Sequence, residues 1–145
     1  MQLTRYTDYA LRTLIQTALM PDGERLSVTT ITATYNISRS HVMKIVQRLG
    51  QLSYLRNVRG KGGGIELGMP PDMINIGQVV RDMEANLQVI DCNSPGCKLQ
   101  PACRLRGILA EAMGAFIGVL DRYTLADLLD NRHELIRLLA LDEPA

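Results

Sequence analysis

The chain has 145 residues, of which 46% are hydrophobic and 21% are charged, and its formal net charge is +1. This composition is typical of one compact globular domain, or of a small domain with an assembly element, and excludes a disordered chain. The first residues contain no apolar run of the length that an export signal needs, and no stretch approaches the ~20 apolar residues of a membrane span. We therefore expect a cytoplasmic protein that has no membrane partner.

The charge is unevenly distributed along the chain. Residues 1–70 hold nine Lys and Arg against four Asp and Glu, whereas residues 71–145 hold seven against eleven. From Arg25 to Ile65 there are seven basic side chains and no acidic one. Such a stripe is either a solvated face or a binding surface for a polyanion. We favour a nucleic acid, because phosphate contacts dominate nucleic-acid affinity.

The first two helices are predicted from apolar spacing. A helix over residues 7–19 begins at Thr4 or Thr7 as its cap. Its apolar stripe consists of Leu11, Leu14, Ile15, Ala18 and Leu19. Residues 27–35 are rich in threonine, which favours a strand, but their apolar residues keep helical spacing and Ser27 is a good helix cap. We predict a second helix there.

A tight turn and a third helix follow. Asn36 tolerates the left-handed conformation that such a turn needs, and Ser38 can cap a helix over residues 39–51. One face of that helix is apolar and the other is polar and basic, which predicts a helix-turn-helix. Its candidates for contact with bases or phosphates are Arg39, Ser40, His41, Lys44 and Gln47.

The next segment predicts a basic hairpin. Apolar residues alternate on both sides of a glycine-rich turn, and Arg59, Gly60 and Lys61 lie at its tip. The turn lacks the Ser or Thr and the following helix of a phosphate-binding loop. A helix-turn-helix followed by a hairpin is a winged helix, whose wing we expect to contact phosphate or the minor groove.

The second half of the chain predicts a helix over residues 75–86 and a longer one over 104–122. A short helix starts at Thr124, and residues 133–141 form an apolar tail. In the long helix Gly107, Gly114 and Gly118 each cost roughly 1 kcal/mol of helix propensity relative to alanine. Because these residues have no side chains, they leave a smooth helix surface that another backbone can approach closely. This surface either packs on its own domain or forms a dimer interface. We favour the dimer interface, because little chain remains to cover the helix.

All three cysteines, Cys92, Cys97 and Cys103, lie within 12 positions of a segment that also contains two prolines and a glycine. Three thiols cannot all pair as disulfides, and structural zinc usually takes two ligand pairs, whereas the two histidines are distant in sequence. Soft thiolates on an irregular loop suit an iron–sulfur cluster. A zinc site, an unrelated group of loop cysteines and an oxygen ligand from the neighbouring Asp91 remain open.

Five motifs in order resemble the winged-helix iron–sulfur repressors that include IscR, and the resemblance covers nearly the whole chain. The motifs are MQLTRYTDYALR, NISRSHVMKIVQRL, VRGKGGGIELG, CNSPGCKLQPACRL and YTLADL. The resemblance implies a homodimeric repressor that holds a [4Fe–4S] cluster and binds a near-palindromic DNA operator. It also implies that nitric oxide nitrosylates the cluster, so that DNA binding is lost and the target genes are derepressed.

The ligand set distinguishes branches of that family. IscR-like members hold a [2Fe–2S] cluster with three cysteines and a histidine shortly after the third. Here Cys103 is followed by Arg104, Leu105, Arg106 and Gly107. The nitric-oxide-sensing branch recruits an aspartate near the N-terminus of the partner subunit, and Asp8 occupies that place. Asp8 is equally suited to a helix first turn, and Arg12, one turn on, either positions it or forms a surface ion pair.

We therefore expect a mainly α fold with a small β-hairpin wing, in which a winged helix-turn-helix domain carries a long dimerisation helix. The expected parts are a DNA-binding domain (1–70), a connector helix and cluster loop (71–103), a dimerisation helix (104–123) and C-terminal helices (124–145). The chain carries no catalytic constellation, so we expect no enzyme. The alternatives are a regulator that senses cluster supply or redox state and, in another class, an iron–sulfur electron-transfer protein.

Overall fold

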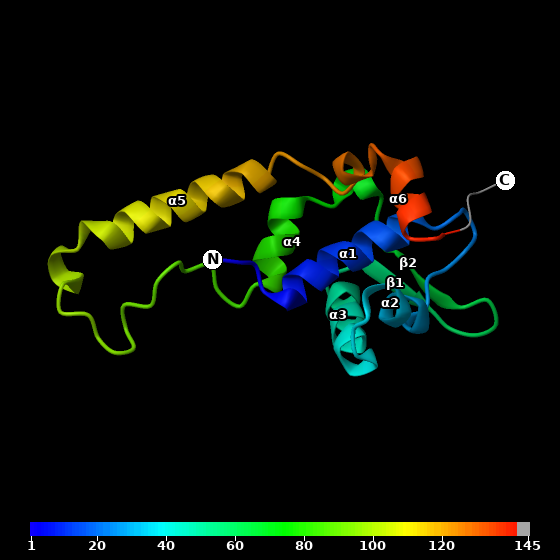
Figure 1. The fold of residues 1–145 in the computed structure, drawn as a ribbon, viewed down its shortest axis with the longest axis horizontal. Coiled ribbons are helices and arrows are strands. Elements are labelled where there is room, and N and C mark those ends of the chain that lie inside the picture. Colours follow the sequence, from blue (N-terminus) through cyan, green and yellow to red (C-terminus); the bar gives the residue numbers. More distant parts are fainter. Residues whose placement is uncertain (142–145) are drawn as a thin grey trace.

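The computed structural model describes residues 1–141, and most of its helices pack around one central helix (Figure 1). The elements are α1 (Arg5–Leu19), α2 (Val28–Tyr35), α3 (Arg39–Gln51), β1 (Leu55–Val58), β2 (Gly64–Leu67), η1 (Pro71–Met73), α4 (Ile76–Met83), η2 (Gln100–Ala102), α5 (Arg104–Leu120), η3 (Ala126–Leu129) and α6 (Arg132–Leu138). The mainly helical fold with a hairpin wing is confirmed. No helix of the described residues is long and apolar enough to cross a membrane.

Polar side chains cap the starts of α1, α2 and α3 as the sequence predicts. Thr4, Ser27 and Ser38 each accept a hydrogen bond from a backbone N–H three residues on, and Asn75 does the same for α4. Asn36 ends α2 with φ 52° and ψ 49°, in the left-handed region. Residues 27–35 are therefore helical, and the chain turns directly into α3.

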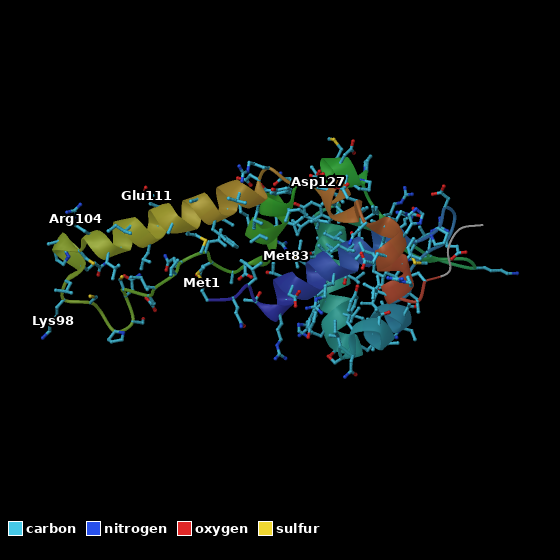
Figure 2. The ribbon with its side chains drawn as sticks, turned by 45° about the horizontal axis from the view of Figure 1, so that its top comes forward. Met1, Met83, Lys98, Arg104, Glu111 and Asp127 are labelled. Carbon is cyan, nitrogen blue, oxygen red and sulfur yellow. The ribbon has the colours of Figure 1, made fainter. Side chains whose placement is uncertain are left out.

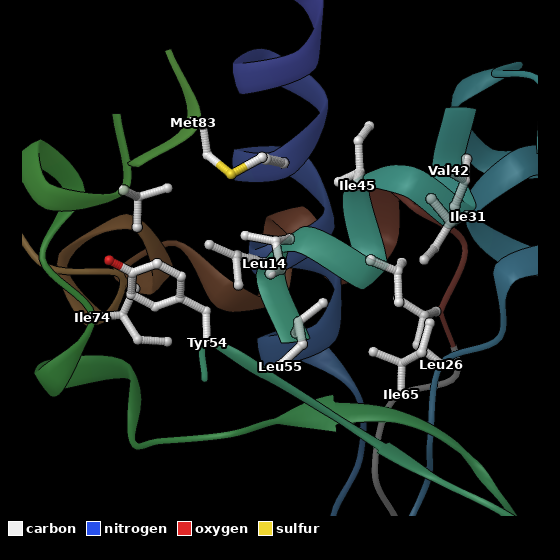
Figure 3. Packing of buried hydrophobic residues seen from close by; sticks show 14 of the residues in the cluster. Leu14, Leu26, Ile31, Val42, Ile45, Tyr54, Leu55, Ile65, Ile74 and Met83 are labelled. Carbon is white, nitrogen blue, oxygen red and sulfur yellow. The ribbon is translucent and has the colours of Figure 1, made fainter. Parts of the chain in front are cut away.

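One hydrophobic core joins the helix-turn-helix, the wing and α4. Leu14 of α1, Ile45 of α3, Leu55 of β1 and Met83 of α4 belong to a single buried cluster (Figure 3). Because α1 packs against α3, α4, β2 and α6, its buried surface is wider than one apolar stripe. Thr7, Thr13, Gln16 and Thr17 are buried, while Leu11, Ile15 and Ala18 of the predicted stripe are only partly buried.

The wing is an antiparallel pair in which Leu55 faces Leu67 and Val58 faces Gly64. A further bridge joins Leu26, just before α2, to Ile65 on the other edge of β2. Strand β2 is therefore paired on both of its edges, with β1 on one side and with Leu26 on the other. Its tip projects freely at the end of the molecule opposite the arm formed by α5 (Figure 1).

Helix α4 ends at Met83, three residues before the predicted end at residue 86. Glu84 has an extended backbone with φ −78° and ψ 134°, and its Oε1 accepts hydrogen bonds from the N–H of Thr4 at 2.7 Å and from the Thr4 hydroxyl at 3.0 Å. This contact between residues 80 positions apart stops the helix. The periodicity of apolar residues in the sequence cannot predict such a contact.

Helix α5 is a long arm that leaves the body at its C-terminal end (Figures 1 and 2). There Arg81 of α4 donates two hydrogen bonds to the carboxylate of Asp121, at 2.5 and 2.7 Å, and Asn75 Nδ2 donates to the Asp121 carbonyl at 2.7 Å. Of the apolar side chains of α5, only Ile117 is buried among the described residues. The predicted end at residue 122 is shortened to Leu120.

The C-terminal segment returns to the body. The predicted short helix after Thr124 is the 3-10 helix η3, and α6 packs on α1, where Arg132 donates to the carbonyls of Ala18 and Leu19 at 2.9 and 3.2 Å. Leu125 belongs to the same core as Leu14. Residues 142–145 of the expected C-terminal part lie outside the described residues. The four-part division of the chain stays a prediction.

Candidate nucleic-acid interface and cysteine loop

Helix α3 presents a polar face to solvent. Its apolar residues Val42, Ile45, Val46 and Leu49 are buried, so the opposite face is exposed. Ser40, Lys44 and Gln47, three of the predicted DNA-contact residues, lie on that exposed face. They line an open groove whose other wall is β1, including Arg56 and Asn57. The surface has the shape and polarity of a recognition helix that is exposed for major-groove binding.

Two other predicted contact residues of α3 have partners within the chain. Arg39 is exposed, and its Nη1 donates to the hydroxyl of Thr29 on α2 at 3.1 Å. The half-buried ring of His41 stacks on Tyr6 with centroids 6.3 Å apart and meets Tyr9 edge-on at 5.8 Å. His41 therefore joins α3 to α1, whereas Ser40, Lys44 and Gln47 face solvent.

The wing presents its basic residues at the tip. Arg59, Gly60 and Lys61 are exposed, and Gly60 has φ 92°, a conformation that favours glycine. Nearer the base, Glu66 pairs with Arg25 at 2.9 Å and with Arg56. The hydrogen bond from Arg56 is the main cause that lowers the pKa of the Glu66 carboxyl. The positive charges near the base of the wing are therefore paired with Glu66, whereas Arg59 and Lys61 at its tip are exposed and have no ion pair among the described residues.

Asp8 lies in the first turn of α1 and forms a bidentate ion pair with Arg12. Both hydrogen bonds, from Arg12 Nε and Nη2, measure 2.8 Å. The guanidinium also lies over the rings of Tyr9 and Tyr35, at 5.7 and 5.9 Å. The hydrogen bond to Asp8 is the main cause that raises the pKa of Arg12. The ion pair between Asp8 and Arg12 is thus present, and it lies in the predicted DNA-binding domain.

The three cysteines lie on the irregular segment between α4 and α5. All are free thiols, with Cys97 exposed and the other two half-buried. A hydrogen bond from the N–H of Cys97 to the carbonyl of Cys92, at 3.0 Å, closes a turn between them. Within that turn Asp91 Oδ1 accepts from the N–H groups of Asn93 and Ser94, at 2.8 and 3.3 Å. Asp91 thereby holds the loop backbone.

The thiols are not gathered into one site within the single chain. No group of three or more His, Cys, Asp or Glu side chains among residues 1–141 is arranged to hold a metal ion. Cys92 lines a cavity beside Arg106 of α5, whereas Cys103 lines a different one beside Lys98. The donor chemistry fits an iron–sulfur cluster, because three reduced thiols near cationic side chains are suited to it. Convergence would accompany binding, as metal binding and local folding are coupled.

The start of the cysteine loop is tied to both α1 and α3. Besides the bond between Glu84 and Thr4, Asp82 accepts from the hydroxyl of Tyr54 at 2.6 Å, and its carbonyl accepts from Arg48 Nη2 of α3 at 3.3 Å. Burial and the bond to Asp82 raise the pKa of Tyr54. The last turn of α4 is thus a junction between the cysteine loop and the recognition helix.

Sequence reasoning missed several residues of these two regions. Met43 and Arg56 lie on the exposed groove beside α3, and Asp82 and Glu84 form the junction. Met43 could have been assigned to the exposed face of α3 from the sequence, because it lies three residues after Ser40 and residues three apart share a helix face. The junction partners are far apart in the chain and had no such signal.

Comparison with known proteins places the whole chain in one group. The family model Rrf2, described as iron-dependent transcriptional regulator, matches residues 3–131. The HTH-type transcriptional regulator NsrR of Bacillus subtilis (strain 168) is 47% identical over 146 residues, which cover 99% of this chain and 100% of that protein.

Solved structures share the same fold. The structure of CymR, the global cysteine regulator of B. subtilis, matches with a TM-score of 0.71 and 26% identity over 88% of this chain and 95% of that one. IscR of T. potens matches with a TM-score of 0.72 over 100% of this chain and 94% of that one. At 19% identity the latter likeness concerns the fold alone.

Proposed function

The chain belongs to the Rrf2 family of iron-dependent transcriptional regulators, and on that premise we propose that it is a homodimeric repressor that senses nitric oxide through a [4Fe–4S] cluster. The observation that carries this proposal is the set of three free thiols on one loop that is tied at its start to the recognition helix. The family's members regulate transcription, which confirms that the protein is not an enzyme. A cytoplasmic location follows from its DNA partner.

We assign cluster binding to Cys92, Cys97 and Cys103 of one subunit and to Asp8 of the partner subunit. Thiolates are the usual ligands of iron–sulfur clusters, and the bound cluster supplies iron that reacts with nitric oxide. Within one chain the loop around Lys98 lies at the outer end of α5, away from the body that carries α1 (Figure 2). This separation, together with the absence of a same-chain metal group in residues 1–141, supports a ligand from the other subunit.

The arm supports the homodimer. Four of its large apolar side chains, Leu105, Ile108, Phe116 and Val119, are exposed, with Leu105 and Ile108 at 56% each. A Cβ added at Gly107, Gly114 or Gly118 would meet nothing within 4 Å in the single chain. A long helix with uncovered apolar and small residues suits close packing on a second copy, since burying this surface is favourable.

DNA binding is assigned to α3 and the wing. Ser40, Lys44 and Gln47 contact base edges or phosphates. Arg39 and His41 join the start of α3 to α2 and α1 and remain candidates for DNA contact. The wing residues Arg59, Gly60 and Lys61 contact phosphate or the minor groove. Two recognition helices of a symmetric dimer suit a near-palindromic operator in double-stranded DNA.

The contacts at the end of α4 link the cysteine loop to α1 and α3, and through them a change at the cluster can affect DNA binding. The three cysteines would hold the cluster, and its loss would free a loop that begins beside Glu84 and Asp82. Glu84 holds the first turn of α1, and Asp82 holds α3 and Tyr54. Release of Asp8 in the partner would act on the same end of α1. Both effects would change the position of α3 relative to the wing, which is the geometry that DNA binding needs.

The test follows operator binding during exposure to nitric oxide. The protein is purified without oxygen, its iron and sulfide are measured, and binding to a selected DNA duplex is recorded before and after the addition of nitric oxide. We expect cluster-loaded protein to bind and nitric oxide to abolish binding. Cys97→Ser protein should contain no intact cluster and should not respond.

Other outcomes are equally informative. Zinc in place of iron and sulfide would refute the cluster. Release by an oxidant, with no effect of nitric oxide, would assign the protein to the redox-sensing alternative.

A further inference from the structure

Met43 is an exposed apolar side chain in the middle of the polar face of α3. It is 53% exposed, whereas Val42 and Ile45 on the core side of the same helix are almost fully buried. Ser40 lies three residues before it and Gln47 four residues after it, so these three side chains share one helix face. Packing of the subunit does not account for a methionine at this position, because the core lies on the opposite side.

The surroundings of Met43 identify its partner as DNA rather than an apolar protein surface. The groove that it lines also contains Lys44 from α3 and, from β1, Asn57 and Arg56, of which Arg56 is paired with Glu66. The residues that line this groove all lie within residues 1–141, and none of them is an aspartate or a glutamate. Val28, Val46 and Leu55 also line the groove, but Met43 is the one whose large apolar side chain is more than half exposed. A groove with a free lysine and one exposed methionine suits a polyanion that presents an apolar group.

The major groove of DNA offers one such group. Among the four bases, only thymine places a methyl group, at C5, on the major-groove edge, and apolar side chains discriminate it by direct contact. Methionine is suited to this contact because its unbranched side chain adapts to irregular surfaces. We propose that Met43 reads the 5-methyl group of a thymine in each operator half-site. This inference rests on the proposed DNA-binding function and adds a specificity-determining residue to it.

The experiment replaces the methyl group without changing base pairing. Cluster-loaded wild-type protein selects duplexes from a randomised pool. Each thymine of one half-site is then exchanged for deoxyuridine, which pairs like thymine but lacks the methyl group. We expect one exchange to weaken wild-type binding about fourfold, which corresponds to one buried methyl group.

Variants link that loss to Met43. Met43→Ala should bind the selected duplex more weakly and be insensitive to deoxyuridine at the same position. Met43→Leu, which keeps an apolar side chain of similar reach, should retain the sensitivity. Met73→Ala removes another exposed methionine, at 69% exposure on η1, and should behave as wild type.

Two results would overturn the inference while leaving DNA binding intact. One is equal wild-type affinity for thymine and deoxyuridine at every position of the half-site. The other is a loss in Met43→Ala protein as large as that in the wild type. Failure of the wild-type protein to select any sequence would instead overturn the proposed function, and the inference with it.

Discussion

At the scale of single residues, the pairing of Asp8 with Arg12 decides how readily Asp8 can serve another partner. The two side chains are 40% and 48% exposed, and exposed ion pairs contribute only about 0–1 kcal/mol. Arg12 is also held by the rings of Tyr9 and Tyr35, so it keeps its place when Asp8 moves. A weak, well-oriented pair therefore suits a carboxylate that exchanges between an arginine and an iron ion of the partner subunit.

The close packing of the end of α5 on α4 depends on Gly77. A Cβ at this position would lie 2.0 Å from Asp121 Oδ1 and 2.9 Å from the Asp121 backbone N. We predict that Gly77→Ala lowers the free energy of unfolding by about 1–2 kcal/mol, because overpacking outweighs the ~1 kcal/mol gained in helix propensity. Denaturant unfolding measures the change.

Gly50→Ala is the matched control for that variant. Gly50 also lies in a helix, but a Cβ there would find its nearest atoms at 3.9 and 4.0 Å, which is ordinary contact. This variant should be as stable as the wild type or up to about 1 kcal/mol more stable. Equal stabilities of the two alanine variants would show that the approach of Asp121 to Gly77 does not matter.

At the scale of elements, the last turn of α4 positions the recognition helix from outside the helix-turn-helix. Asp82 binds Tyr54, which follows α3, and its carbonyl binds Arg48 within α3. Gln78 also donates to Asp82, at 3.0 Å, which orients the carboxylate. Helix α4 therefore acts as a brace between the cysteine loop and α3, and its bond to Tyr54 can be tested by pH.

We predict that Tyr54 makes stability depend on alkaline pH. Its pKa is raised in the folded protein by burial and by Asp82, so folding favours the neutral phenol. That contribution is complete below the unfolded value of about 10 and is lost as pH rises above it. Tyr54→Phe should cost about 1 kcal/mol near pH 8, and the difference from wild type should shrink above pH 10.

Unfolding titrations of both proteins across this pH range measure the difference. Tyr123→Phe, at an exposed tyrosine, should leave the alkaline slope of the wild type unchanged. A constant difference between wild type and Tyr54→Phe from pH 8 to 11 would remove Tyr54 as the cause.

At the scale of the whole molecule, the arm and the wing extend to opposite ends, with the core between them (Figure 1). The cysteine loop runs along the arm, so a partner that packs on α5 also approaches the cysteines. The proposed DNA-binding surface lies on the body. In this arrangement, one dimer contact would both complete the proposed cluster site and place two recognition helices.

A mixed dimer tests the shared site. One subunit carries Asp8→Ala and the other carries Cys97→Ser, and two different affinity tags isolate the mixed species. If ligands come from both subunits, one site keeps all three cysteines and Asp8 while the other loses two ligands. We predict about half of the wild-type iron and sulfide, with a wild-type absorption spectrum.

The two parent homodimers are the controls for this experiment. Asp8→Ala homodimers lack Asp8 at both sites, and Cys97→Ser homodimers lack a thiolate at both. If all ligands came from one subunit, the mixed dimer would contain one site of each defective kind and no wild-type site. A spectrum equal to the average of the two homodimers would therefore contradict the shared site.

Local chemistry explains why much of the fold could be predicted from the sequence. The caps at Ser27 and Ser38, the left-handed turn at Asn36 and the glycine-rich wing each depend on residues within a few positions of one another. The resemblance to an iron–sulfur repressor family also rests on such short motifs, and the family membership is confirmed. The ligand and DNA-contact assignments stay predictions.

The sequence by itself determined the winged helix, the family and the grouping of the three cysteines, because short-range hydrogen bonds and chain order encode them. Only the tertiary structure decided where α4 ends and which side of α1 is buried. Both depend on contacts between distant residues, such as Thr4 with Glu84. The separation of the cysteine loop from the body also appears only in three dimensions, since it follows from the direction in which α5 leaves α4.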